Sequence, residues 1–221
     1  MSDNVIELTD ASVRFSDAGH ETWGLRAANI TFRVGLATIL GVSGSGKSTL
    51  LSIVGLLRRP TTGTVTFLGK RTSDLSGAAL DSLRAGSVGF VFQDHALVPH
   101  LSILENVMLP LLARKASADT GKALELLQRV GLGDHIHKLP SQISLGQAQR
   151  AALCRGLAGS PQVILADEVT ASLDSASAQV IIDVLREAVE AGIIVILATH
   201  DERLAQIADS VVRLQEGRVL T

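Results

Sequence analysis

The residues best suited to chemistry form one glycine-rich segment, Gly41-Val42-Ser43-Gly44-Ser45-Gly46-Lys47-Ser48. This spacing is typical of a loop that binds phosphate groups. Its glycines would let successive backbone N–H groups turn toward phosphate oxygens, where larger side chains would block the approach. Lys47 would reach the β- and γ-phosphates, and the hydroxyl group of Ser48 would bind Mg²⁺. The alternative interpretation is a glycine-rich turn that happens to precede a helix.

A second segment could supply the metal ligand and the base that a phosphate site needs. Its sequence is Val163-Ile164-Leu165-Ala166-Asp167-Glu168. Asp167 ends an apolar strand, so its carboxylate would emerge at the carboxyl edge of the sheet, where open α/β sheets bind ligands. Glu168 is the candidate base that positions an attacking water. An Asp-Glu pair after a strand can also cap a helix, but the phosphate-binding segment favours a nucleotide site.

The elements around these segments predict a sheet that is mostly parallel. A short apolar strand at residues 36–40 precedes the phosphate-binding segment, and an apolar helix begins over residues 48–54. Three further apolar runs, at residues 86–93, 162–166 and 193–198, are typical of parallel strands covered on both faces. Strand, loop and helix therefore follow one another as a phosphate-binding loop requires.

Other strands are predicted at the two ends of the chain. Alternating or β-branched runs at residues 5–15, 25–34 and 63–69 predict an antiparallel region. A loop over residues 16–21, with a turn at Asp17-Ala18-Gly19, would join the first two strands. Near the carboxyl end, residues 211–214 and 218–220 predict a hairpin that turns through Glu216-Gly217.

Helical periodicity dominates the middle of the chain. Apolar residues at Ala123, Leu126, Leu127 and Val130 have helical spacing, and Gly131 follows as a stop. Further helices are predicted over residues 101–112, limited by a proline at position 110, over 145–157, and over 175–191, capped by residue 174 or 175. Residues 94 to about 143 are therefore interpreted as a helical insertion.

Together these patterns predict one α/β domain over residues 1–221. We expect its core in residues 1–93 and 144–221, with an antiparallel β region at the amino end and a helical subdomain over about 94–143. The chain length suits one such domain with a smaller inserted lobe.

Composition limits the possible function. Twenty Lys and Arg residues against 22 Asp and Glu give a formal charge of −2, and no basic run is present, so a nucleic-acid binder is not expected. The mean hydropathy of +0.32 is high, yet no apolar run approaches the roughly 18 residues that cross a bilayer. The first ten residues do not resemble a signal peptide. A single cysteine, Cys154, suits a reducing compartment and a buried structural role.

Four further motifs resemble those of the ATP-binding-cassette (ABC) ATPases. Ile143-Ser144-Leu145-Gly146-Gln147, followed by residues 148–157, resembles the signature segment of that family. The other three are Gln93, which matches the Q-loop, Ala171-Ser172-Leu173-Asp174, which matches the D-loop, and Ala198-Thr199-His200-Asp201, which carries the switch histidine. Order and spacing agree along almost the whole chain. The resemblance therefore implies a P-loop ATPase of the ABC type.

The resemblance also implies a division of labour between two copies of the chain. In the family, two ATPase domains pair head to tail, and each ATP lies between the phosphate loop of one and the signature segment of the other. Ser144 and the helix amino terminus would then point at a γ-phosphate in trans. Gln93 would contact Mg²⁺ or the water, and His200 would hold the γ-phosphate. The residues implied to bind nucleotide are Phe15, Ser43, Gly44, Ser45, Gly46, Lys47, Ser48, Thr49, Ser144, Gly146, Gln147 and Asp174; those implied to bind metal are Ser48, Gln93 and Asp167.

The resemblance implies an adenine-stacking aromatic residue, and the chain departs from the usual motifs at two positions. Phe15 stands where the family places an aromatic that stacks on adenine, although it could be a core strand residue, and Trp23 is a weaker candidate. Leu145 replaces the first glycine of the usual Leu-Ser-Gly-Gly-Gln signature, which puts the contact in trans in doubt. Val169 stands where proline normally follows the Asp-Glu pair, and hydrolysis is expected to survive that change.

Residues 86–93 and 97–111 resemble the branch that contains macrolide-exporter, lipoprotein-releasing, haem-exporting and cell-division ATPases. This implies a separate membrane permease, with the ATPase on the cytoplasmic face of the membrane. An apolar cluster after the Q-loop could receive a cytoplasmic helix of that permease or form the core of the helical lobe; it consists of Phe92, Leu97, Val98, Leu101 and Ile103. A regulatory ATPase of the cell-division type, which moves no cargo, is the alternative function, and the sequence does not identify a cargo.

Overall fold

The computed structural model describes residues 5–17, 20–113, 120–171 and 173–220. The strands are β1 (Val5–Asp17), β2 (His20–Arg33), β3 (Gly35–Leu40), β4 (Thr62–Phe67), β5 (Lys70–Arg71), β6 (Val88–Val91), β7 (Val163–Asp167), β8 (Ile194–Thr199), β9 (Ser210–Gln215) and β10 (Arg218–Leu220). The α-helices are α1 (Lys47–Val54), α2 (Gly77–Ser87), α3 (Ile103–Ala113), α4 (Thr120–Arg129), α5 (Leu145–Ala158), α6 (Ser175–Glu190) and α7 (Glu202–Gln206). Three short 3₁₀ helices are η1 (Thr72–Asp74), η2 (Gly133–His135) and η3 (Pro140–Gln142).

Two sheets organise these elements. The core sheet has the order β10-β9-β3-β8-β7-β6, in which all neighbours are parallel except the terminal β9–β10 hairpin. The second sheet has the order β2-β1-β4-β5 and is antiparallel. The predicted combination of a mostly parallel core sheet with an antiparallel region at the amino end is therefore confirmed.

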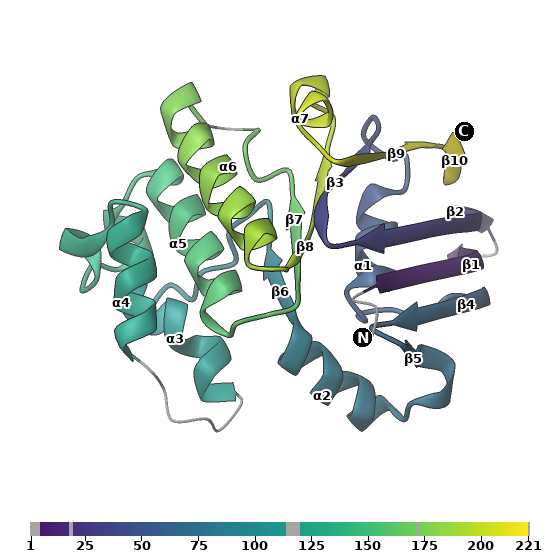
Figure 1. Ribbon diagram of the computed structural model, residues 1–221, viewed down its shortest axis with the longest axis horizontal. Helices are drawn as coiled ribbons and strands as arrows, with labels where there is room; N and C mark the ends of the chain where they lie inside the picture. Colours follow the sequence, from purple (N-terminus) through teal and green to yellow (C-terminus); the bar gives the residue numbers. More distant parts are fainter. Residues whose placement is uncertain (1–4, 18–19, 114–119, 172, 221) are drawn as a thin grey trace.

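Apolar side chains cover both faces of the core sheet. On one face, α1 lies between the two sheets, and its Leu50 and Ile53 are fully buried in a cluster that both sheets share. On the other face, a second apolar cluster joins the sheet to α3, α4, α5 and α6. Figure 1 shows this layering, with the antiparallel sheet on the right and the four helices on the left. Because helices or strands cover both faces, β3 and β8 consist of buried residues throughout.

The middle helices differ from the sequence expectation in one respect. Pro110 lies inside α3 rather than limiting it, and the helix continues to Ala113. Tertiary packing explains this, because Val107 and Leu111 on either side of Pro110 are buried in the cluster with α5. The division into a core and a helical subdomain over about 94–143 stays a prediction. Helix α5, which lies outside that range, packs against both α3 and α4, so the helices of the expected subdomain share a cluster with the rest of the chain.

The strand limits also differ in places. The β1–β2 pairing continues to Asp17 and His20, so a loop over the whole of residues 16–21 was wrong, and positions 18 and 19 of the expected turn lie outside the described residues. The strand expected over 86–93 is shorter, because residues 86 and 87 end α2. Helix α2 itself had no clear sequence signal; it is capped by Ser76 and buries little beyond Leu80.

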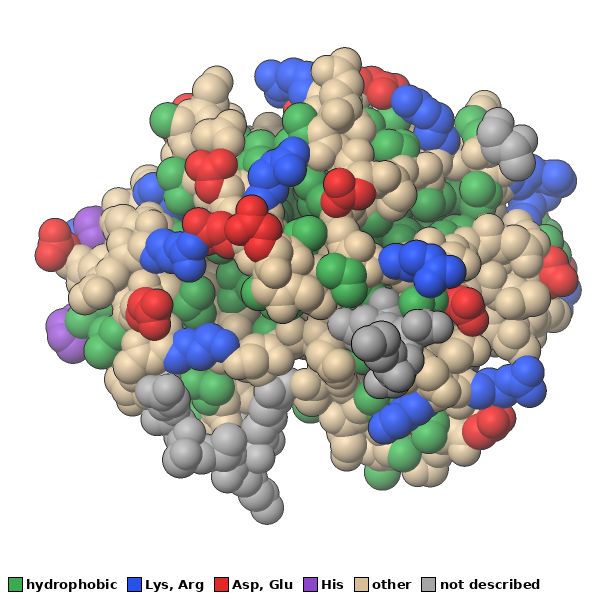
Figure 2. Space-filling model, in the orientation of Figure 1, with side chains coloured by type: hydrophobic (Ala, Val, Ile, Leu, Met, Phe, Trp, Pro, Cys, Tyr) green, Lys and Arg blue, Asp and Glu red, His purple; other side chains and the backbone are tan. Residues whose placement is uncertain are grey.

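Charged side chains of both signs are distributed over the surface. On the face in Figure 2, Lys and Arg side chains alternate with Asp and Glu rather than gathering by sign. This distribution agrees with the small net charge of −2. Within the described residues, no helix is both long and apolar enough to cross a membrane.

Candidate nucleotide site

The glycine-rich segment forms a tight loop between β3 and α1. Gly44 and Gly46 have φ angles of 77° and 108°, in the left-handed region that favours glycine. A Cβ atom on Gly46 would lie 2.4 Å from the carbonyl oxygen of Gly24, so no larger residue fits there. The backbone N–H of Gly217 donates to the carbonyl oxygen of Ser45 at 2.9 Å, which ties the terminal hairpin to the loop.

Lys47 lies at the start of α1 and is only 7% exposed. Its Nζ atom donates to the carbonyl oxygens of Gly41 at 2.7 Å and Val42 at 3.1 Å. The same ammonium group lies 3.7 Å from Oε1 of Glu168. The loop therefore holds a buried cation against its own carbonyl groups and one carboxylate, where an incoming phosphate can replace the carbonyl contacts.

Ser48 and Asp167 meet across the site. The hydroxyl group of Ser48 donates to Oδ2 of Asp167 at 3.0 Å, although the residues are 119 positions apart. Burial raises the pKa of Asp167, the hydrogen bond from Ser48 opposes that rise, the charge of Glu168 adds to it and the charge of Lys47 opposes it. Hydroxyl and carboxylate oxygens are ligands that suit Mg²⁺, which needs few protein ligands when phosphates supply the others. The pair therefore fits a magnesium ion.

Glu168 follows directly and has an unusual backbone. Its φ angle of 49° is left-handed, and its N–H donates to the carbonyl oxygen of Ala198 at 2.9 Å. Such a conformation in a residue other than glycine costs energy and is common at functional sites. The side chain is 12% exposed, and Oε1 lies 3.0 Å from Nδ1 of His200. The second oxygen, Oε2, is buried and has no hydrogen-bond partner among the described residues.

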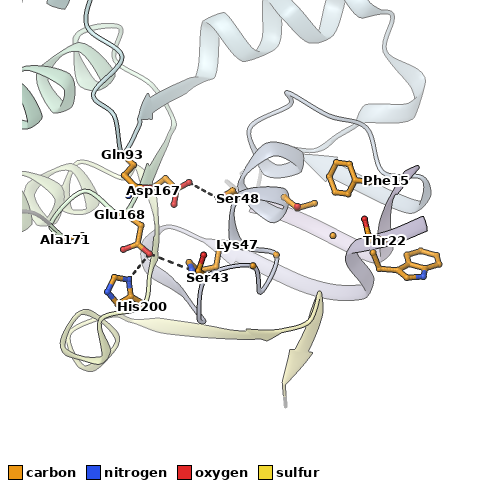
Figure 3. A pocket seen from close by; sticks show the side chains of 15 residues that line it. Phe15, Thr22, Ser43, Lys47, Ser48, Gln93, Asp167, Glu168, Ala171 and His200 are labelled. Carbon is orange, nitrogen blue, oxygen red and sulfur yellow. Dashed lines mark hydrogen bonds and ion pairs between the residues drawn. The ribbon is translucent and has the colours of Figure 1, made fainter. Parts of the chain in front are cut away.

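These groups line one cavity of about 570 Å³. Figure 3 shows Lys47 and Ser48 facing Asp167, Glu168 and His200 across it, with Gln93 near the carboxylates. The predicted residues that line this cavity are Phe15, Ser43, Gly44, Gly46, Lys47, Ser48, Thr49, Gln93, Asp167, Glu168 and His200. Ser45 is buried in the loop rather than at the cavity wall. Two segments named from separate motifs therefore converge on one site.

Both aromatic candidates lie at the far end of the cavity. Phe15 is half-buried, and the guanidinium carbon of Arg58 lies 4.6 Å from its ring centroid. A Cβ atom on Gly24 would lie 2.4 Å from Cε2 of Phe15, so this glycine lets the ring lie against the backbone. Trp23 is 39% exposed and also lines the cavity. Both rings therefore border the cavity, and Phe15 is the more buried of the two.

The signature segment lies elsewhere on the chain. Ser144 caps α5, with its hydroxyl group accepting from the N–H of Gln147 at 3.3 Å. Asp174 caps α6 and accepts from the N–H of Ser177 at 2.9 Å, which confirms the expected helix cap. Ser144, Gly146, Gln147 and Asp174 do not line the cavity. Ser172 of the predicted D-loop lies outside the described residues. One chain therefore brings the phosphate loop, Gln93, the Asp-Glu pair and His200 to this cavity, but not Ser144, Gly146 or Gln147 of the signature segment.

The two departures from the usual motifs line a second cavity of about 540 Å³. Leu145 is exposed at the start of α5, whereas Val169 is buried. Asp167 and Glu168 border this cavity as well as the first one. The change at position 169 therefore lies in the wall beside both carboxylates and leaves them in place.

Sequence reasoning missed several contacts of the site. Thr22, Gly24 and Ala171 line the cavity, and Gly217 bonds the phosphate loop from the terminal hairpin. Gly24 lies just before the strand expected at residues 25–34 and falls inside β2 only in the structure. The contact from Gly217 has no sequence signal, because it depends on how the chain returns to the loop.

Comparison with known proteins gives a consistent result. Residues 26–171 match the family described as ABC transporter. The chain is 40% identical over 219 residues to the "Probable export ATP-binding/permease protein MacB" of Pseudomonas entomophila, which covers 98% of this chain and 33% of that protein. It is 44% identical over 201 residues to the "Lipoprotein-releasing system ATP-binding protein LolD" of Anaeromyxobacter dehalogenans, covering 89% and 84%. The chain thus spans about a third of the length of the MacB relatives that it matches.

Solved structures agree with these relatives. The structure titled "Dimeric Structure of MJ0796, a Bacterial ABC Transporter Cassette" superposes with a TM-score of 0.92 at 35% identity, covering 98% of this chain and 97% of that one. A structure with the same values is titled as a post-hydrolysis state of the same cassette, dimeric and bound to ADP and Pi.

Proposed function

Because the chain belongs to the ABC transporter family, we propose that it is the ATP-binding and ATP-hydrolysing part of an ABC-type export system. The relatives are named as ATP-binding proteins of export and lipoprotein-releasing systems, and one structural neighbour is bound to ADP and Pi. The site of this chain carries the groups that such a reaction needs. Its phosphate loop, Ser48–Asp167 pair and largely buried Glu168 all border one cavity.

The environment of the two Glu168 carboxylate oxygens is the observation that best supports a role in ATP hydrolysis. Oε1 is held by His200 and lies near Lys47, while Oε2 is buried without a partner among the described residues. A carboxylate fixed by one oxygen can accept a proton from water with the other. We assign Glu168 as the general base and His200 as the residue that orients it and contacts the γ-phosphate.

The remaining groups bind ATP and distribute its charge. Lys47 contacts the β- and γ-phosphates, with the backbone amides of the loop around them. Ser48, Asp167 and Gln93 would hold Mg²⁺, which would supply positive charge to offset that of the phosphate groups. The fit of a hydroxyl and a carboxylate 3.0 Å apart supports this assignment.

Glu168→Gln tests this assignment. The variant retains the hydrogen-bonding shape but cannot take a proton, so phosphate release should fall by about 10²–10⁴-fold while ATP affinity persists. Glu190→Gln, an exposed position at the end of α6, is the matched control and should release phosphate at the parent rate. Unchanged turnover in Glu168→Gln would remove Glu168 from the mechanism.

We further propose that the second half of each ATP site comes from another copy of the chain, paired head to tail. Ser144 is exposed and lies outside the cavity of its own chain, at the amino terminus of a 14-residue helix. Helix amino termini favour phosphate through free N–H groups and the helix dipole. The dimeric state of the structural neighbours supports this pairing. Loss of the γ-phosphate would remove the bridge, so hydrolysis would loosen the pair.

The partner outside the pair is a membrane permease on whose cytoplasmic face the ATPase works. The names of the MacB relatives, which join ATP-binding and permease functions, support this proposal. A shallow groove beside β6 is the candidate docking surface, and Phe92, Ala96, Pro110 and Arg155 contribute to it. Of the apolar cluster that was expected to receive a permease helix, Phe92 lines this groove and is 38% exposed. Leu97, Val98 and Leu101 are half-buried and do not line it, and Ile103 is fully buried in the core.

Phe92→Asp tests the groove, with Leu112→Asp as the control at another exposed apolar position, on α3. Co-purification with the permease should fall at least about 10-fold for Phe92→Asp and stay unchanged for the control, because a carboxylate in a desolvated contact costs several kcal/mol. A folded Phe92→Asp protein that co-purifies with the permease as well as the parent does would contradict the groove proposal.

A further inference from the structure

The amino terminus of α5 depends on the orientation of one amide side chain. Oε1 of Gln147 accepts from the backbone N–H of Ser144 at 2.9 Å, and the backbone N–H of Gln147 donates to the hydroxyl group of Ser144 at 3.3 Å. This reciprocal pair is a capping box, which satisfies two backbone donors and fixes the first turn of the helix. Because a backbone N–H can only donate, the oxygen of the Gln147 amide must face Ser144.

The nitrogen of the same amide therefore faces His135. Nε2 of Gln147 lies 3.0 Å from Nε2 of His135. The amide nitrogen is a donor, so the imidazole nitrogen must accept, and the proton of the neutral ring must sit on Nδ1. Nδ1 is buried and has no hydrogen-bond partner among the described residues. The ring therefore accepts a hydrogen bond from the amide of Gln147, while its Nδ1–H has no partner among the described residues.

The backbone around His135 is itself fixed to the start of α3. The N–H of Leu104 donates to the carbonyl oxygen of Ile136 at 3.0 Å, and the N–H of Ile103 donates to that of Lys138 at 2.9 Å. The N–H of Lys138 also donates to the carbonyl oxygen of His135 at 3.0 Å. His135 thus joins a segment bonded to α3 to the first turn of α5.

We propose that His135 is a positioning residue for the signature segment: as the Nδ1–H tautomer it accepts from Gln147 and so holds Ser144 and the first turn of α5 in the orientation that meets ATP on a second chain. This inference rests on the proposed contact of Ser144 with ATP in trans. His135 acts only through Gln147 and touches no nucleotide. Its loss affects assembly of the ATP-bound pair, and it leaves ATP binding by a single chain unchanged.

The tautomer can be measured on the intact chain without nucleotide. Long-range ¹H–¹⁵N correlation spectra of uniformly ¹⁵N-labelled protein, assigned with His135→Gln, should show a protonated Nδ1 and an unprotonated Nε2 for His135. A ring protonated on Nε2 would overturn the proposal. This result does not depend on dimerisation, so it separates failure of the positioning role from failure of the proposed function.

Three variants then test the consequence in the Glu168→Gln background. His135→Gln places an acceptor oxygen near the position of Nε2, whereas His135→Asn is too short to reach and His135→Ala has no acceptor. In sedimentation runs with ATP and Mg²⁺, the dissociation constant of the pair should rise about 5-fold for Ala and Asn and return to within about 2-fold of the parent for Gln. ATP affinity of the single chain should stay constant in all three.

Equal dimerisation by the His135→Ala and parent proteins would overturn the proposal, as would a His135→Gln protein no better than His135→Asn. In active protein with Glu168 restored, His135→Ala and His135→Asn should raise the protein concentration that gives half-maximal turnover. Their turnover at saturating protein should stay constant. A parent that fails to pair with ATP would instead refute the proposed function.

Discussion

Glu168 and His200 meet through a contact of 3.0 Å between Oε1 and Nδ1, at the ends of neighbouring parallel strands. Position 167 of β7 pairs with position 198 of β8, so Glu168, directly after β7, and His200, directly after β8, both lie at the carboxyl edge of the sheet. The sheet register therefore brings the two segments close together. The two side chains differ in exposure: His200 is 63% exposed, whereas Glu168 is almost buried.

This contact predicts that the two side chains act as one unit. His200→Ala should lower the rate of phosphate release by about 10²-fold or more while ATP affinity changes little, because Glu168 loses the group that orients it. The double variant should be about as slow as the slower of the two single variants. Steady-state assays of both single variants and the double variant measure this, and losses that multiply would show independent roles.

Lys47 should account for much of the ATP affinity. In Lys47→Ala, nucleotide titration should show binding about 10- to 100-fold weaker, because a charge-assisted contact with phosphate is lost. Lys70→Ala removes an exposed lysine on β5 and is the control. A Lys47→Ala protein that melts normally and binds ATP with undiminished affinity would contradict the loop assignment.

The two aromatic candidates should separate on substitution. Phe15 is half-buried, with Arg58 over its ring, so its orientation is already fixed before a base stacks on it. We expect Phe15→Ala to weaken ATP and ADP binding equally, by about 10-fold, and Trp23→Ala to weaken both by less. Calorimetric titration of each variant gives the answer, and a larger loss from Trp23→Ala would reverse the assignment.

Cys154 should be inert in the folded protein. Burial raises the pKa of its thiol to about 12, so very little thiolate exists near pH 8. The side chain is also fully buried. Iodoacetamide at pH 8 should leave native protein unmodified and should alkylate one thiol per chain after denaturation. Mass spectrometry measures both states. Rapid native alkylation would show that α5 opens from its neighbours.

Local patterns predicted the parts of the site that lie within one stretch of chain. The phosphate loop and the Asp-Glu pair could be predicted because glycine spacing and an apolar strand that ends in carboxylates are short-range signals. His200 could be placed only through its resemblance to a family motif. Its contact with Glu168 depends on the register between β7 and β8, which no local pattern encodes.

The remaining contacts need the folded chain. Gly217 reaches Ser45, and His135 reaches Gln147, only after distant elements pack together. Helix α2 escaped prediction because it buries little apolar surface, and Pro110 was expected to limit a helix that tertiary packing sustains. Local preference is thus overruled where buried neighbours on both sides of a residue favour another conformation.

In the proposed pair, Ser144 of one chain completes the ATP site of another. Sedimentation of Glu168→Gln protein with ATP and Mg²⁺ tests this contact, with Ser144→Arg added in one sample and Ser73→Arg, at an exposed position on η1, in another. We expect pairs for the parent and for Ser73→Arg, but single chains that still bind ATP for Ser144→Arg. Pairing of Ser144→Arg with the parent affinity would contradict the proposed contact.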